Sequence, residues 1–256
     1  MKLIRSLFDR RALLPAAALL ILSGVYELGY YAIFALPLPA VGQGALFIVW
    51  YLAAGVALYC LMTAAWHRNR DQSSPAAVKS GRRKAPKASE PELTVSGALR
   101  SLALAAFYLV LVYGILRPLY GLAASHSWVL VPVELLCALV LIFCGPLTVI
   151  WNQAAACRQR PWQLLSGLWK RRSLVNGWCF IVLVRMALDT LLGGLFTLAF
   201  GVNAFSLSTL MLFQGDPLSS AALYASGGFA GAALLFCLTG CLYAWMMAGW
   251  FLHGTE

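Results

Sequence analysis

Six long apolar runs, separated by short polar or basic segments, constrain the fold of this chain more than any other feature of its sequence. A helix needs about 20 apolar residues to cross a hydrocarbon core of about 30 Å, and each run reaches that length. Strands of a membrane barrel would instead alternate apolar and polar residues over short segments, and no such segments occur in this sequence. The pattern therefore predicts a bundle of membrane-spanning helices.

The composition agrees with this fold class. Hydrophobic residues make up 61% of the chain and charged residues 11%, whereas soluble domains are about half apolar and about a quarter charged. We predict an all-α, polytopic integral membrane protein that forms one membrane domain over residues 1–256. The six expected spans are about 12–36, 46–66, 97–120, 128–151, 174–200 and 226–250. The first run could also be read as a signal peptide, but no small-residue cleavage site follows it promptly, so we interpret it as a span.

The placement of basic residues predicts the orientation. Of the 19 lysines and arginines, 17 fall in three segments, at 2–11, 68–100 and 158–172, which alternate with nearly uncharged loops. This is the positive-inside pattern, so both termini are expected in the cytoplasm and the protein in a bacterial-type inner membrane. The net charge of +10 is then mainly a topology signal, and no nucleic-acid partner is expected. Six tryptophans map to the inner interface as an aromatic belt: Trp66, Trp151, Trp162, Trp169, Trp178 and Trp250.

The segment 67–97 is the longest linker, and its Asn, Ser, Pro, Lys and Ala content is typical of a disordered loop. Its basic residues could bind anionic lipid headgroups or a partner, or they could serve only as a solvated topology determinant. The spacing of Ser89 and Glu92 predicts a capping box, and hence a helix that begins there and continues into the third span.

The fifth span carries Arg185 and Asp189 near its centre. Two charges at that depth cost roughly 5–7 kcal/mol on insertion scales. The 14 Leu, Ile, Val and Phe residues of the run offset this by at most ~0.3–0.6 kcal/mol each. This helix therefore inserts at about break-even by itself, and we expect polar partners for it inside the bundle.

Five ionisable residues form the candidate intramembrane cluster. We expect Arg185 to pair with Glu27 or Asp189, and Arg117 to pair with Glu134. In the first span Ser23, Glu27 and Tyr31 share one helical face, which should look into the bundle. A surplus carboxyl in this interior would have a raised pKa and could carry a proton or cation. The alternative is that the five charges neutralise one another and fix the helix register.

A second candidate region is an amphipathic helix at about 161–172, lying in the inner headgroup layer. Apolar residues of this segment share one face and basic residues flank them. The residues concerned are Trp162, Leu165, Trp169, Lys170, Arg171 and Arg172. Such a helix could couple the protein to a cytoplasmic partner or could be a plain interfacial anchor.

Catalytic motifs are absent from the sequence. There is no P-loop, HExxH, G-x-S-x-G or CxxC motif, and His67, His126 and His253 all lie outside the expected membrane core. We therefore expect no enzymatic activity, no cofactor and no metal site. The leading hypothesis is a non-catalytic component of a transport or envelope-assembly system that contacts the anionic inner leaflet and other membrane subunits. The alternative is a proton- or ion-coupled transporter, and a lipid-modifying enzyme is third.

Overall fold

The computed structural model of the chain describes residues 6–79, 91–116, 118–119, 122, 127–160, 162, 171–184, 187 and 240–253. Within these ranges the regular structure is helical and contains no strand, which confirms the predicted all-α class. A short 3₁₀ turn η1, Arg10–Ala12, precedes helix α2, Leu13–Ala35. The other labelled elements are α3 (Ala40–Lys79), α4 (Val95–Leu109), η2 (Val110–Leu116), α6 (Ser127–Ala156) and α11 (Cys241–His253).

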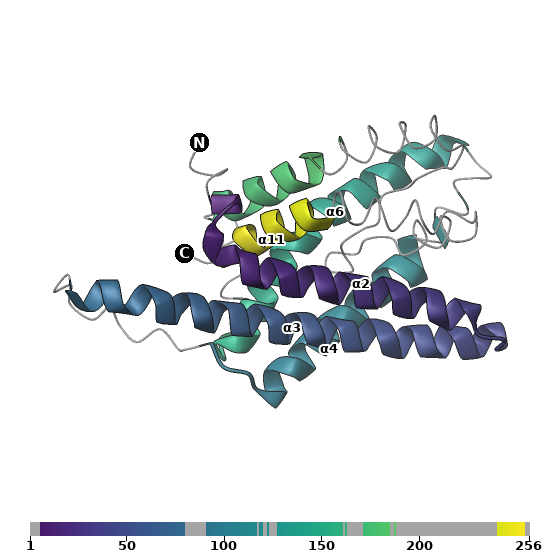
Figure 1. Ribbon diagram of the computed structural model, residues 1–256. Coiled ribbons are helices and arrows are strands. Elements are labelled where there is room, and N and C mark those ends of the chain that lie inside the picture. Colours follow the sequence, from purple (N-terminus) through teal and green to yellow (C-terminus); the bar gives the residue numbers. More distant parts are fainter. Residues whose placement is uncertain are drawn as a thin grey trace, which may run out of the picture.

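Helices α2 and α3 form an antiparallel hairpin (Figure 1). The chain between them contains Pro37 and Pro39, and proline cannot continue a helix without losing a backbone hydrogen bond. The side chain of Gln43 donates to the backbone carbonyl of Leu36 at 2.9 Å, beside the last turn of α2. The turn at 36–39 lies at the end that we call the outer end of the bundle.

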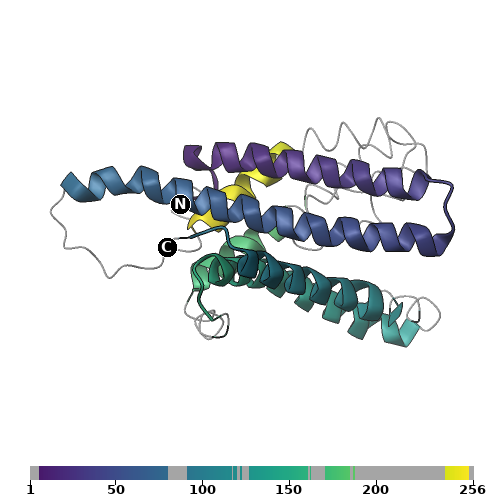
Figure 2. The same ribbon diagram turned by 90° about the horizontal axis from the view of Figure 1, so that it is seen from below.

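Helix α3 is longer than the predicted second span. It continues past Trp66 to Lys79, so it includes the first part of the segment predicted to be a disordered loop. Its 40 residues correspond to about 60 Å, and Figure 2 shows it projecting beyond the other helices at the end opposite the turn. Each residue added to an existing helix gains one hydrogen bond, so a helix that already crosses the bundle can extend beyond it. Residues 80–90 of the predicted loop lie outside the described ranges.

Helix α4 begins later than the predicted capping box. Its N-cap is Thr94, whose side-chain oxygen accepts from the backbone N–H of Gly97 at 3.0 Å. Residues 91–94 are not helical, and Glu92 instead binds the end of α6 through its backbone N–H, which donates to the carbonyl of Ala156 at 3.0 Å. The capping-box prediction was therefore wrong, because Glu92 is taken up by a tertiary contact that local spacing does not encode.

Among the described residues, three helices are long and apolar enough to cross a membrane: Arg10–Ala35, Ala40–Arg70 and Val95–Leu116. They correspond to the first three predicted spans. The third of them ends in seven residues of π-helix, η2. Helix α6 covers the predicted span 128–151 and contains Pro132 and Pro146. A shorter apolar helix, Arg172–Val184, covers the first part of the fifth predicted span, and α11 covers the last part of the sixth.

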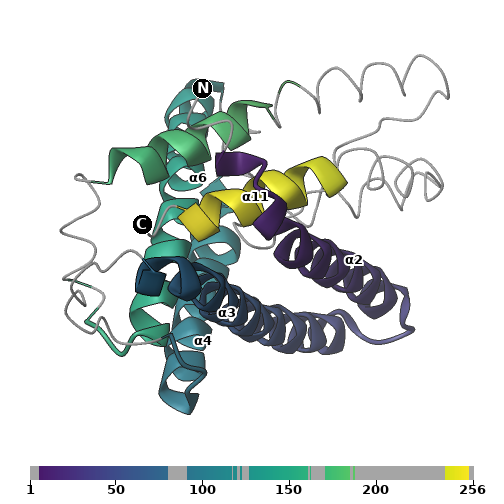
Figure 3. The same ribbon diagram turned by 60° about the vertical axis from the view of Figure 1, so that its left-hand side comes forward.

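Helix α3 is central to the described bundle, because it contacts α2, α4, α6 and α11. Helix α11 lies along α2, and α6 lies along α4 on the other side of α3 (Figure 3). Two glycines allow aromatic rings of neighbouring helices to approach the backbone closely. The indole of Trp178 lies against Gly145 of α6, and the indole of Trp50 lies against Gly29 of α2, where a Cβ atom would collide with the ring. Small residues at helix crossings serve the same purpose in other membrane bundles.

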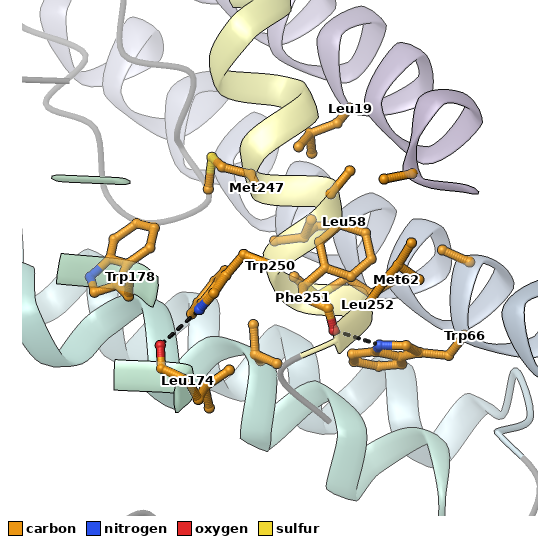
Figure 4. Packing of buried hydrophobic residues seen from close by; sticks show 14 of the residues in the cluster. Leu19, Leu58, Met62, Trp66, Leu174, Trp178, Met247, Trp250, Phe251 and Leu252 are labelled. Carbon is orange, nitrogen blue, oxygen red and sulfur yellow. Dashed lines mark hydrogen bonds between the residues drawn. The ribbon is translucent and has the colours of Figure 1, made fainter. Parts of the chain in front are cut away.

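The core consists of two clusters. The larger one contains buried residues from α2, α3, α4, α6, α11 and helix Arg172–Val184, with Met62, Trp66, Trp178, Trp250 and Phe251 among its members (Figure 4). The smaller one lies toward the outer end, between α2, α3 and α4. Its members are Tyr26, Tyr30, Phe47, Tyr51, Ala54 and Ala105.

Candidate functional site

The N- and C-terminal parts of the chain meet at the end of the bundle opposite the outer turn (Figure 1). Asp9 caps η1 by accepting from the backbone N–H of Arg11 at 3.0 Å, and its other carboxylate oxygen lies 2.9 Å from Nε2 of His253, the last residue of α11. The indole N–H of Trp245 donates to the backbone carbonyl of Asp9 at 3.0 Å. The pKa of Asp9 is lowered by the hydrogen bond from Arg11 and by His253, although partial burial acts in the opposite direction.

Tryptophan side chains fasten this end further. The indole N–H of Trp66 donates to the carbonyl of Phe251 at 3.1 Å, which links α3 to the last turn of α11. The indole N–H of Trp250 donates to the carbonyl of Leu174 at 2.7 Å, which links α11 to helix Arg172–Val184 (Figure 4). The ring of Trp250 also packs on that of Trp178 with centroids 5.0 Å apart. These bonds join segments that are far apart in the sequence.

The segments around α4 and α6 reach the same end. The indole N–H of Trp151 donates to the carbonyl of Arg100 at 2.9 Å, and the side chain of Arg171 donates to that of Gln153 at 3.0 Å. Glu92 forms an exposed ion pair with Arg158 at 3.0 Å. One end of each of these helices therefore lies at the end of the bundle opposite the outer turn: α2, α3, α4, α6, helix Arg172–Val184 and α11.

We call this the basic end, because it collects arginines. The described acidic side chains here are Asp9 and Glu92, which pair with His253 and Arg158. Most of the arginines are exposed. The arginines described at this end are Arg10, Arg11, Arg68, Arg70, Arg100, Arg158, Arg160, Arg171 and Arg172. The described part of this end therefore carries an excess of positive charge beside several tryptophans.

Inside the bundle, hydroxyl groups join α4 to its neighbours. The hydroxyl groups of Tyr108 and Thr148 lie 3.0 Å apart, and each lies 2.8 Å from the carbonyl oxygen of Cys144 in α6. On the other side of α4, the hydroxyl of Ser101 donates to the carbonyl of Gly55 in α3 at 3.1 Å. These groups bridge neighbouring helices in the way that polar side chains stabilise membrane bundles.

The buried side chain of Asn152, also in α6, is bonded less completely. Its side chain is 1% exposed, and its Nδ2 donates only to the sulfur of Met62 at 3.6 Å. Its Oδ1 accepts no hydrogen bond from the residues that the structure describes. A thioether is a weak acceptor, so this buried amide is poorly satisfied by the described part of the chain.

The smaller core cluster shapes the outer end. Phe47 packs edge-on against Tyr30 and Tyr113, with ring centroids 5.6 and 5.2 Å apart. Tyr113 belongs to the π-helix η2, and π-helical turns occur frequently at functional sites. The aromatic contacts join α2, α3 and η2 within the outer half of the bundle.

The five predicted intramembrane charges are only partly placed. Glu27 lies in α2 and Glu134 in α6, but their side chains are outside the described part of the structure. Arg117, Arg185 and Asp189 lie wholly outside the described residues, so all of the predicted ion pairs remain predictions.

The predicted inward face of the first span is wrong in part. Ser23 is buried, but Tyr31 is 45% exposed. The buried face of α2 instead contains Leu19, Ser23, Tyr26 and Tyr30. This face, which packs on α3 and α11, is rotated around the helix relative to the predicted row of Ser23, Glu27 and Tyr31.

The predicted inner interfacial helix falls mostly outside the described residues, including Leu165, Trp169 and Lys170. Trp162 is described and is 72% exposed, with its ring edge-on to that of Trp151 at 6.5 Å. Arg172 begins helix Arg172–Val184, so the C-terminal boundary predicted for the interfacial helix coincides with the start of the next helix.

Sequence reasoning missed the Asp9–His253 bridge, and no local signal points to it, because its partners are separated by 244 positions. It predicted that Trp66, Trp151 and Trp250 share one interface, and the structure brings them to the basic end, while the side of the membrane that this end faces stays a prediction. The described residues contain no group of three or more His, Cys, Asp or Glu side chains that could hold a metal ion. Comparison of the chain with protein-family models, curated proteins and solved structures gives no match.

Proposed function

We propose that this chain is a six-span protein of a bacterial-type cytoplasmic membrane, with both termini inside. We propose further that it acts as a non-catalytic component of a transport or envelope-assembly system. The observation that carries this proposal is the convergence at the basic end. This proposal assumes that α6 and the regions containing Arg172–Val184 and α11 each cross the membrane once. Every helix end that is expected on the inner side then lies at the basic end, beside both termini and the arginines.

The use of the interior polar groups supports a structural role for the bundle. Tyr108, Thr148 and Ser101 are engaged with hydroxyl or carbonyl groups of α6 and α3. Such bonds hold helices at a fixed register and leave these hydroxyl groups occupied. The arrangement suits a support that presents its basic end to the inner leaflet and to other subunits.

The alternative is a proton- or ion-coupled transporter that uses Glu27, Arg185 and Asp189. Two described features favour it: the unsatisfied buried amide oxygen of Asn152 and the π-helix η2 in the third span. Intramembrane ionisable residues are expensive to insert and commonly mark ion pathways. A lipid-modifying enzyme is a weaker third candidate, because no cluster of acidic or histidine ligands is found among the described residues.

A double-mutant cycle on the charge cluster separates the first two functions. The free energy of unfolding in mixed micelles is measured for Arg185→Ala, Asp189→Asn, Glu27→Gln and the two double variants that contain Arg185→Ala. Strong destabilisation by each single change, with recovery in a double variant, supports a structural network. Glu92→Gln is the control, because Glu92 is exposed outside the membrane helices.

The opposite result points to transport. If Asp189→Asn or Glu27→Gln leaves the free energy of unfolding unchanged or raises it, the wild-type charge does not serve stability. The proposed non-catalytic role is then overturned if the wild-type protein also transports protons. That activity is tested by proton uptake into proteoliposomes that contain a trapped pH-sensitive dye. Wild-type uptake that Asp189→Asn abolishes would establish the transporter.

The accessory role has its own readout. The tagged full chain is purified from its native membrane in a mild detergent, with and without Trp162→Ala. An accessory subunit should lose a defined co-purifying membrane protein in the variant, whereas Trp128→Ala should retain it. Trp128 is the matched control because it is 78% exposed and lies in the half of α6 away from the basic end.

A further inference from the structure

Helix α6 ends in a common hydrogen-bonding motif, but with arginine at the position that glycine usually occupies. The backbone N–H of Gln159 donates to the carbonyl of Ala154 at 2.8 Å, and that of Arg158 donates to the carbonyl of Ala155 at 3.4 Å. This pair of bonds is the Schellman motif, in which the residue after the helix adopts a left-handed conformation. That residue is Arg158, with φ of 54°. Glycine is the usual occupant, because a side chain destabilises this conformation.

The ion pair of Arg158 does not account for an arginine at this position. Its partner Glu92 lies at 3.0 Å, but the two side chains are 71% and 57% exposed, and exposed pairs contribute little to stability. The segment around Glu92 is held separately by its backbone bond to Ala156 and by the hydroxyl of Tyr59, which donates to the carbonyl of Glu92 at 3.2 Å. A glycine at position 158 would fit the backbone better and would leave these bonds in place.

Two more arginines lie beside Arg158. The guanidinium of Arg100 donates to the backbone carbonyl of Gln159 at 2.9 Å, which places it between Arg158 and Arg160. Arg160 is exposed, and the described acid at this corner is Glu92. We call Arg100, Arg158 and Arg160 the arginine corner.

The arginine corner lies at the depth of the tryptophan belt. Trp151 donates its indole N–H to the carbonyl of Arg100 at 2.9 Å. The ring of Trp162, two residues beyond Arg160, lies edge-on to Trp151 and is largely exposed. Exposed indole rings next to basic residues are typical of the layer where lipid phosphates and acyl chains meet.

We propose that the arginine corner binds the phosphate of an anionic phospholipid from the leaflet at the basic end, with Trp162 against its acyl region. Guanidinium groups match phosphate oxygens through paired N–H donors, so arginine is favoured over lysine for this contact. The strained backbone at Arg158 is retained because it directs a cation at the lipid layer, whereas glycine would supply none. This inference rests on the membrane orientation in the proposed function, but it is independent of transport.

The test is a thermal unfolding titration of the full chain in neutral detergent micelles. The titrants are a short-chain phosphatidylglycerol, the matching phosphatidylcholine and inorganic phosphate. The variants are Arg158→Gly and Arg160→Gln, and Arg68→Gln is the control because it removes a basic-end charge from α3, which contributes no residue to the corner. Without lipid, Arg158→Gly should melt at a higher temperature than the wild type.

With phosphatidylglycerol, each corner variant should need about fivefold more lipid for half of the maximal shift, whereas Arg68→Gln should behave as the wild type. A lower melting temperature for Arg158→Gly with unchanged lipid dependence would show that Arg158 serves only the Glu92 pair. Equal shifts from phosphatidylcholine would remove the charge argument, and equal shifts from inorganic phosphate would identify a free-anion site. Either result overturns the proposal while leaving the charge-cluster cycle, and hence the proposed function, standing.

Discussion

The two ends of the bundle are held by different contacts. At the basic end, Trp66 and Trp250 donate indole N–H groups to backbone carbonyls of segments distant in sequence. At the outer end, Phe47 packs against the rings of Tyr30 and Tyr113. The outer half also has one indole bond, from Trp50 to the carbonyl of Tyr26 at 3.1 Å. That carbonyl lies within α2, where it already accepts a helical hydrogen bond. The carbonyl of Phe251 lies in the last turn of α11, where the described part of the chain supplies no helical donor for it.

The difference reflects the solvent at each level. Helix ends expose carbonyls that must find donors, and the aromatic belt supplies them where several ends converge. Within the hydrocarbon layer there is no hydrophobic drive between helices, so side-chain packing has the larger part in holding the outer cluster, beside the indole bond of Trp50. We therefore expect the basic end to depend on specific donors and the outer end to depend on shape.

The largest effect is expected from Trp250→Ala. Trp250 is 3% exposed, packs on Trp178 and bonds Leu174, so its removal should lower the free energy of unfolding by about 3–5 kcal/mol. Denaturation in mixed micelles measures the change. Trp128→Ala, at a 78% exposed site of α6, should stay within ~0.5 kcal/mol. Comparable losses in the two variants would mean that the basic end is not a special anchor.

Adding one methyl group at each glycine–indole contact should distinguish the two ends. Gly145→Ala drives a Cβ into the ring of Trp178, which is buried and held by Trp250, so we expect a cost of about 1–3 kcal/mol. Gly29→Ala meets the ring of Trp50, which is only half-buried and is therefore less confined than the ring of Trp178. Its cost should be clearly smaller by the same denaturation measurement. The reverse order would show that the outer end is the more rigid one.

Replacing tryptophan by phenylalanine removes the indole N–H donor but keeps an aromatic ring, so it tests the role of the donor at each end. Trp66→Phe leaves the carbonyl of Phe251 without its donor and should cost about 0.5–1.5 kcal/mol. Trp50→Phe should cost less, because the carbonyl of Tyr26 keeps its helical partner. Unfolding curves of the two variants measure the difference. If both changes cost the same, ring size rather than the indole donor explains the tryptophan placement.

The smallest effect concerns pH. Asp9→Asn keeps a capping oxygen for Arg11 but loses the charge beside His253, so it should cost less than about 1 kcal/mol at neutral pH. Because the pKa of folded Asp9 is lowered from 3.8, its contribution is present above that value and is lost as pH falls through the folded pKa. The stability gap between wild type and variant, measured from pH 7 down to 3, should therefore close only in acid. A gap that stays constant would exclude Asp9 as its source.

Local sequence patterns were sufficient to predict the bounds of a helix where neighbouring residues in the sequence end it. The first span was predicted at 12–36 and found as Leu13–Ala35, because Pro37 and Pro39 end a long, predominantly apolar run. The extension of α3 to Lys79 was missed, because composition alone suggested a loop after Trp66. The start of α4 was missed because Glu92 is fixed by α6, which no spacing rule encodes.

The candidate site followed the same division. That Trp66, Trp151 and Trp250 lie at one end of the bundle was predictable, because each is near the end of an apolar run, whereas the side of the membrane that they face stays a prediction. The bonds from Trp245 to Asp9 and from Trp66 to Phe251 depend on how the chain ends return to one another, and they span 236 and 185 positions. The left-handed backbone of Arg158 also had no signal, since the sequence has arginine where the motif favours glycine.

The most direct test of this account is which side of the membrane each end faces. Single cysteines at Arg68, Gly44 and Thr255 in a cysteine-free background are treated with a membrane-impermeant maleimide in intact cells and in inside-out vesicles. The account predicts that Gly44→Cys reacts only in cells, and that Arg68→Cys and Thr255→Cys react only in vesicles. Labelling of Arg68→Cys and Gly44→Cys from the same side, or of Thr255→Cys from outside, would contradict a bundle whose basic end holds both termini in the cytoplasm.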